Sequence, residues 1–252
     1  MRLCPDWRSN EGGLAPFRLP ALSARGARMH TSRLVALLVV LAVAGCARPP
    51  ERPRPPEPEQ IPNLSTVKSA IKEDRSSGRW EADIDRVADD CVAAAQHARS
   101  GVERPAVVFD IDETLLSNWP YVIANDFARL TPRFVDWARR AECPPIEPVK
   151  RFFVTMRDAG IACFLITGRR ENLRTVTERN LERAGLTGWR GIAFRPVADD
   201  DPSIVPFKSG ERAKIEQQGY TIVANIGDQE SDLEGGHALH VCKVPNPMYL
   251  IP

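Results

Sequence analysis

The stretch Ala106–Asp112, AVVFDID, decides the fold of this 252-residue chain. It begins with four apolar residues, three of them valine or phenylalanine, which are enriched in β-strands. A short apolar run without polar alternation indicates a strand that is buried on both faces. Asp110 and Asp112 stand at the end of this run, where two neighbouring carboxylates raise each other's pKa. The stretch therefore predicts a buried strand that ends in a site able to hold a cation.

Further apolar runs and amphipathic segments surround this strand. Strands are expected at 161–166, 220–226 and 238–244; helices are expected around Trp80 to Cys91, from Pro148 to Gly160, from Leu173 to Ala184 and over 211–218. Buried strands that alternate with helices favour an α/β fold, with a Rossmann-like parallel sheet covered by helices on both faces. Ligands bind beyond the carboxyl ends of such strands, where Thr167 and Asp228 also stand.

An insertion at about 117–146 separates the first strand from the next helix. It is rich in aromatic residues, including Trp119 and Tyr121. We expect it to form a small helical cap over the carboxyl ends of the strands, with most of its aromatic side chains packing the cap itself.

The N-terminal part carries the signals of export. Residues 34–44, LVALLVVLAVA, are too few to span a bilayer as a helix but suit the core of a signal peptide, with Arg33 before them. The following residues, VAGC at 43–46, resemble a bacterial lipobox, which implies cleavage before Cys46 and a lipid on its sulfur. The alternative is an ordinary signal peptide followed by a chance cysteine. Residues 29–45 are thus read as a lipoprotein signal, and 1–28 as a disordered extension or as sequence upstream of a true start at Met29.

Residues 46–62 are rich in proline and predict an extended spacer, which leaves 63–252 as the folded domain. The chain is expected to lie outside the cytoplasm, held to the cell envelope (outer membrane or outer surface) by a lipid on Cys46. The formal net charge is +1, so composition gives no reason to expect a nucleic-acid partner. Oligomeric state is left open.

Four cysteines belong to the predicted domain, and their pairing is left open: Cys91, Cys143, Cys163 and Cys242. Cys163 and Cys242 lie in apolar runs, where a free buried cysteine is common, so no disulfide is claimed. No spacing among the cysteines and histidines suggests zinc.

The D-x-D pair favours phosphate chemistry with Mg²⁺. Magnesium prefers oxygen ligands and often shares its coordination with substrate phosphate. An aspartate can attack phosphorus and form an aspartyl phosphate. A second aspartate two residues later can give a proton to the leaving oxygen and take one from water.

Four dispersed motifs in the same order resemble those of the haloacid dehalogenase (HAD) superfamily: DIDET at 110–114, TGR at 167–169, Lys208, and GDQESD at 227–232. The resemblance covers 63–252 and is to class B, subfamily IIIB acid phosphatases of the bacterial lipoprotein type, which also include plant storage proteins. It implies Asp110 as nucleophile and metal ligand, and Asp112 as general acid/base with a ligating backbone carbonyl. It also implies Thr167 and Gly168 as phosphate-binding residues, Lys208 as a neutralising cation, and Asp228 and Asp232 as further metal ligands.

Some of these residues have simpler explanations. Thr167 suits a helix N-cap, Lys214 competes with Lys208, and Asp232 suits the start of a helix. Storage relatives can lose the nucleophile, but this chain retains Asp110. The acidic, proline-bearing segment 199–206 is expected to be a loop before Lys208.

The predicted activity is hydrolysis of small phosphomonoesters. A nucleoside monophosphate is one candidate substrate, because Trp119 and Tyr121 are suited to stack on a base. Arg169 is expected either to contact the substrate or to pair with a cap carboxylate. Two alternatives stay open: phosphotransfer by an enzyme of the same superfamily, and a surface lipoprotein that binds phosphate or nucleotide without turnover.

Overall fold

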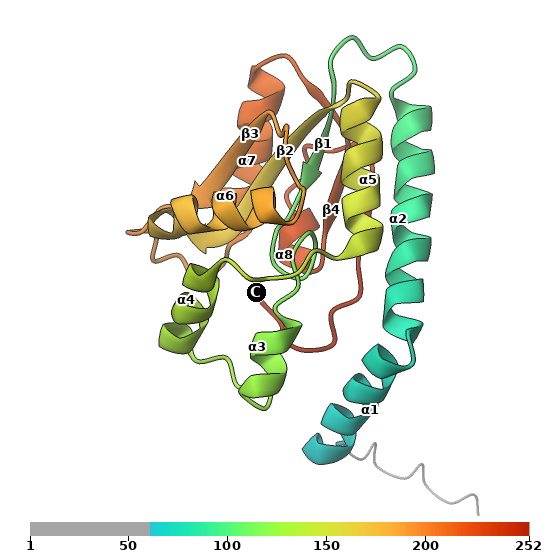
Figure 1. The fold of residues 1–252 in the computed structure, drawn as a ribbon. Helices are drawn as coiled ribbons and strands as arrows, with labels where there is room; N and C mark the ends of the chain where they lie inside the picture. Colours follow the sequence, from blue (N-terminus) through green and yellow to red (C-terminus); the bar gives the residue numbers. More distant parts are fainter. Residues whose placement is uncertain (1–60, 252) are drawn as a thin grey trace, which may run out of the picture. The chain divides into compact units, whose positions relative to one another are not determined.

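A computed structural model describes residues 61–251. Its centre is a parallel sheet of five strands in the order β3-β2-β1-β4-β5 (Figure 1). The strands are β1 (Pro105–Phe109), β2 (Ala162–Arg170), β3 (Gly191–Arg195), β4 (Thr221–Gly227) and β5 (Val241–Lys243). The predicted Rossmann-like α/β fold is confirmed.

Alternate residues of β1 face two different cores. Val107 and Phe109 pack into the larger core together with side chains of α2 (Arg79–Ala98), α5 (Glu147–Asp158) and α6 (Arg174–Arg183). Ala106 and Val108 face the smaller core, where Ile215 of α7 (Val205–Gln217) packs against them. Because both faces are covered by helices, the strand is apolar at every position, as expected of a parallel sheet.

The cap insertion contains α3 (Trp119–Ala124) and α4 (Thr131–Arg140). Figure 1 shows both helices beside the end of the sheet where the strands finish. The remaining elements are α1 (Leu64–Ser76), the 3₁₀ turn η1 (Glu171–Leu173) and α8 (Glu230–Leu233).

The helix expected at 211–218 begins earlier than predicted, at Val205, so Lys208 lies in its first turn. The segment 199–204 is a loop as expected, and only the last two residues of the predicted loop belong to the helix. Pro206 explains the early start, because proline suits the first turn of a helix. The sequence pattern hides this start because Gly210 interrupts the helical pattern. The strand β3 was not predicted, since its short sequence at the sheet edge has only two buried residues.

The structure gives the cysteine pairing that the sequence left open. A disulfide joins Cys91 of α2 to Cys242 of β5, whereas Cys143 and Cys163 are free and buried. Both partners face the larger core, where neighbouring elements bring them together. An apolar run therefore indicates burial of a cysteine but not whether its sulfur has a partner.

Each helix within 61–251 is too short or too polar to cross a bilayer. The predicted extension, lipoprotein signal, Cys46 and nearly all of the spacer lie outside the described residues.

Candidate active site

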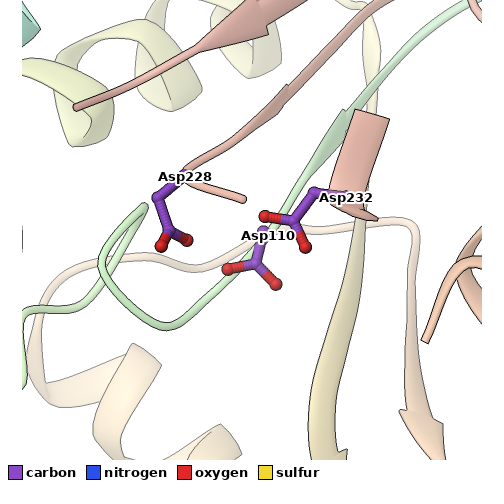
Figure 2. A group of neighbouring side chains, drawn as sticks. All are labelled: Asp110, Asp228 and Asp232. Carbon is purple, nitrogen blue, oxygen red and sulfur yellow. The ribbon is translucent and has the colours of Figure 1, made fainter. Parts of the chain in front are cut away.

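Three buried carboxylates meet at the carboxyl ends of β1 and β4. Asp110 directly follows β1, Asp228 directly follows β4, and Asp232 lies on α8 (Figure 2). One oxygen from each carboxylate lies within 4.8 Å of the others. The backbone packs closely here, since a Cβ on Gly227 would lie 2.5 Å from the Asp232 side chain.

Lys208 connects two members of this cluster. Its Nζ donates to Asp110 Oδ1 at 2.5 Å and also to Asp232 Oδ1. The rival Lys214 is exposed and pairs with Glu211. Asp232 also caps α8, because its Oδ2 accepts from the backbone N–H of Gln229. Asp232 therefore stands at the start of a helix as well as in the carboxylate cluster, and its role as a metal ligand stays a prediction.

The electrostatics of the cluster favour a cation. Burial holds the pKa of Asp110 well above its ordinary value, although the charge of Lys208 lowers it. The neighbouring carboxylates raise it further. Burial and the charge of Asp232 raise the pKa of Asp228 to about 6. Among the described residues, Lys208 is the cation that pairs with this cluster, through Asp110 and Asp232, so one positive charge accompanies three carboxylates. Protons or a divalent metal ion can supply the missing positive charge.

Asp112 does not join the three carboxylates through its side chain. Its carboxylate accepts from Arg169 at 2.7–3.1 Å and from Asn118 Nδ2 at 2.8 Å. Burial alone would raise the pKa of Asp112, but the charge and hydrogen bonds of Arg169 and the bond from Asn118 bring it below its ordinary value. Asn118 is in turn held by Trp137 of the cap, whose Nε1 donates to Asn118 Oδ1 at 3.0 Å.

The guanidinium of Arg169 pairs with Asp112 and not with a cap carboxylate. Arg169 also donates to Thr177 Oγ1 at 3.1 Å and is buried. Because Arg169 lines the cavity over the carboxylates, its contact with a substrate stays a prediction.

Thr167 and Gly168 lie at the end of β2. Thr167 is buried and its Oγ1 accepts from Arg169 N at 3.1 Å, so its side chain does not cap the helix that follows. A Cβ on Gly168 would lie 2.8 Å from the Ile204 side chain, which explains why this position has no side chain. Gly168 lines a cavity over the three carboxylates.

A cavity of about 150 Å³ opens over the carboxylates. Its walls come from several strand ends, the cap and the C-terminal segment: Asp110, Asp112, Arg129, Phe134, Gly168, Arg169, Arg195, Ile204, Lys208, Asp228, Gln229, Asp232, Tyr249 and Ile251. Most of the predicted polar residues therefore surround one space.

The stacking residues predicted from the sequence do not line this cavity. Trp119 packs against Phe127 and lies beneath the guanidinium of Arg75. Tyr121 is buried, and its hydroxyl bonds the backbone of Leu130 within the cap. The prediction for both residues was wrong, because both rings are used in packing.

Phe134 and Tyr249 occupy the cavity wall instead, and the guanidinium of Arg129 lies near both rings. Sequence reasoning missed all three. Phe134 belongs to the aromatic-rich insertion and Tyr249 to the last residues of the sequence, and nothing in the sequence pattern placed either one at the site.

Comparison with known proteins agrees with this geometry. The sequence model of one family, described as HAD superfamily, subfamily IIIB (acid phosphatase), matches residues 51–252. The chain belongs to this family. It is a phosphatase that hydrolyses phosphomonoesters. Phosphatases of this superfamily use a divalent metal, and the cluster of Asp110, Asp228 and Asp232 is a candidate site for it.

Relatives from plants include an acid phosphatase, stem glycoproteins and vegetative storage proteins. The chain is 33% identical to acid phosphatase 1 of Solanum lycopersicum over 186 residues, which are 72% of this chain and 73% of that one. It is 34% identical to the stem 28 kDa glycoprotein of Glycine max over 57% of this chain and 59% of the relative. Vegetative storage protein 1 of Arabidopsis thaliana is 32% identical, over 58% of this chain and 55% of its own length.

A solved structure shares the fold. The class C acid phosphatase from Bacillus anthracis aligns with a TM-score of 0.62 and 22% identity, over 73% of this chain and 85% of that one. At this identity the likeness supports the fold of the phosphatase and not the role of any residue.

Proposed function

We propose that this phosphatase works with Mg²⁺ and through an aspartyl phosphate on Asp110. The observation that carries the proposal is the buried cluster of Asp110, Asp228 and Asp232 with Lys208 beside it. Taking like charges out of water is costly unless a cation accompanies them. The cluster lies at the cavity, at the strand ends where ligands of parallel sheets bind.

The donor set fits magnesium. The three carboxylates, with the backbone carbonyl of Asp112, would hold the ion through oxygen atoms, which is the ligand type that Mg²⁺ prefers. When bound, the ion would neutralise charge on the phosphoryl oxygens.

The protein's own residues supply the covalent chemistry. An Asp110 oxygen attacks phosphorus, and the bond from phosphorus to the leaving oxygen breaks. Asp112 gives that oxygen a proton, then takes one from water as the water oxygen attacks phosphorus and releases Asp110. Lys208 counters the charge on Asp110 and the phosphoryl group from a fixed position, which costs no reorganisation during the reaction.

Arg169 and Asn118 fix the Asp112 carboxylate in one orientation. In the absence of substrate this ion pair keeps Asp112 deprotonated, which is the form that takes a proton from water. Its acid role requires that a proton arrive with the substrate or after substrate binding, which brings a new negative charge beside the pair.

The test is phosphate release from p-nitrophenyl phosphate and nucleoside monophosphates by the purified protein, with Mg²⁺, with chelator, and as Asp110→Asn. We expect turnover that chelator and the substitution both abolish, and a phosphorylated protein that can be trapped when Asp110 is intact. Binding of phosphate without turnover would favour the non-catalytic lipoprotein. Transfer of phosphate to an added alcohol in preference to water would favour a phosphotransferase.

We further propose nucleoside monophosphates as substrates, because Phe134 and Tyr249 place two aromatic rings at the cavity. Base stacking on such rings adds about 1–3 kcal/mol per base. Phe134→Ala should lower the preference for nucleotides over glycerol phosphate, whereas Trp119→Ala, outside the cavity, should not. Equal effects of the two substitutions would reject the idea.

Export and lipid anchoring remain proposals. The disulfide between Cys91 and Cys242 supports them, since stable disulfides form mainly in oxidising compartments. Metabolic labelling with a fatty-acid analogue should label the full chain but not a Cys46→Ala variant. Unlabelled full chain in the supernatant would leave an ordinary signal peptide as the better interpretation.

A further inference from the structure

The C-terminal segment, residues 244–251, lies against the residues that follow β4. Ile251 N donates to Gln229 Oε1 at 2.8 Å, and Ser231 Oγ donates to Ile251 O at 2.8 Å. Tyr249 and Ile251 also line the cavity. The segment is therefore part of the wall of the site as well as the end of the fold.

Asn246 of this segment contacts the candidate metal ligand Asp228 directly. Its Nδ2 donates to Asp228 Oδ2 at 2.7 Å, and Gln229 Nε2 donates to the same oxygen at 2.5 Å. The other oxygen, Oδ1, has a single longer contact, from Thr114 Oγ1 at 3.2 Å. Two amides thus hold one oxygen of the carboxylate and leave the other more available to a metal ion.

The amide of Asn246 is itself fixed. Its Oδ1 accepts from the backbone N–H of Met248 at 2.9 Å, so the amide must turn its NH₂ group toward Asp228. Trp80 Nε1 donates to the neighbouring Pro245 O at 3.0 Å, which ties the segment to α2. The disulfide at Cys242 secures the strand that leads into the segment.

We propose that Asn246 is a positioning residue that orients Asp228 for Mg²⁺. The proposal rests on the proposed metal-dependent function. Groups that hydrogen-bond a metal ligand set its orientation, and their loss lowers metal affinity by about 10–100-fold. Gln229 contacts the same oxygen but also bonds the backbone of Tyr249 and Ile251. Asn246 makes one backbone bond, from Met248, so its substitution disturbs fewer contacts of the segment.

The experiment measures Mg²⁺ binding to the purified protein by titration calorimetry, for wild type, Asn246→Ala and the control Asn172→Ala. Asn172 is exposed on η1, away from the cavity lining. We expect the Mg²⁺ dissociation constant of Asn246→Ala to rise about 10–100-fold, with Asn172→Ala unchanged. Turnover of p-nitrophenyl phosphate by Asn246→Ala should be low at limiting Mg²⁺ and should recover to within about twofold of wild type at saturating Mg²⁺.

If Asn246→Ala fails to fold, Asn246→Leu preserves the side-chain volume and removes the hydrogen bonds. A purely structural role would lower the melting temperature and leave the dissociation constant unchanged, which would overturn the proposal. If the wild type hydrolyses substrate with Mg²⁺ and Asn246→Ala binds Mg²⁺ with equal affinity, this inference is rejected and the metal-dependent function is not. A wild type that neither binds nor needs Mg²⁺ rejects the metal-dependent function and this inference with it.

Discussion

Removal of the disulfide should cost this phosphatase a large part of its stability. The bond joins positions 151 residues apart, so it closes most of the folded domain into one loop. For a loop of that length, the chain-entropy relation gives about 5 kcal/mol at 25 °C, and measured losses are about 2–5 kcal/mol. A double variant, Cys91→Ala with Cys242→Ala, should therefore lose about 2–5 kcal/mol of the free energy of unfolding.

Urea denaturation without Mg²⁺ measures this difference. Reductant should shift the midpoint of wild type toward that of the double variant and should leave the double variant unchanged. The matched control is Cys163→Ala, since Cys163 is equally buried but free. Its stability should fall through lost packing alone, by about 1 kcal/mol, and should not respond to reductant.

Two results would refute this reasoning. A double variant within about 1 kcal/mol of wild type would show that the bond constrains the unfolded chain little. A wild type that is insensitive to reductant, with thiols at Cys91 and Cys242 that react freely once the chain unfolds, would show that the bond does not form.

Two further predictions concern the charges of the cluster. Lys208→Met leaves two buried carboxylates without their partner, so the free energy of unfolding of the metal-free protein should fall by about 3–5 kcal/mol and kcat by about 10²–10³-fold. The control Lys214→Met removes an exposed lysine and should cost under about 1 kcal/mol without changing kcat. Equal losses in the two variants would contradict the assignment of Lys208. Because the pKa of Asp228 is raised from 3.8 to about 6, the folded protein binds more protons than the unfolded chain between these values. The free energy of unfolding of the metal-free protein should thus fall by up to about 3 kcal/mol as pH rises from 4 to 7. Mg²⁺ should oppose this loss. A free energy of unfolding that rises over this pH range at constant ionic strength would contradict the prediction.

The parts of the site that the sequence predicted share one property. Asp110 and Asp228 each follow an apolar strand, and strands of a parallel sheet end at the same edge. Topology alone therefore brings them together, whatever the details of packing. The same reasoning predicted the fold class, because the buried parts of these parallel strands are mostly apolar.

The parts that sequence reasoning missed depend on elements whose position the chain pattern does not specify. Phe134 reaches the cavity from the cap, and Tyr249 reaches it from the C-terminal segment. Neither segment has a strand register that would place its side chains. Trp119 was misplaced for the same reason: its distance along the chain from Asp110 is short, but the turn of α3 directs its ring toward Arg75.

The pairing of Arg169 with Asp112 depends partly on topology, which the sequence pattern predicts, and partly on packing, which it does not. Asp112 lies just beyond β1, and Arg169 lies near the end of the adjacent strand β2, so their proximity follows from topology. Their direct ion pair depends on burial, since an exposed arginine would remain hydrated and free to meet a substrate. Arg169 is almost completely buried, and Asn118 of the cap insertion donates a further hydrogen bond to the Asp112 carboxylate. The cap thereby holds Asp112, the proposed acid/base residue, while the strand ends, α7 and α8 hold the charged cluster.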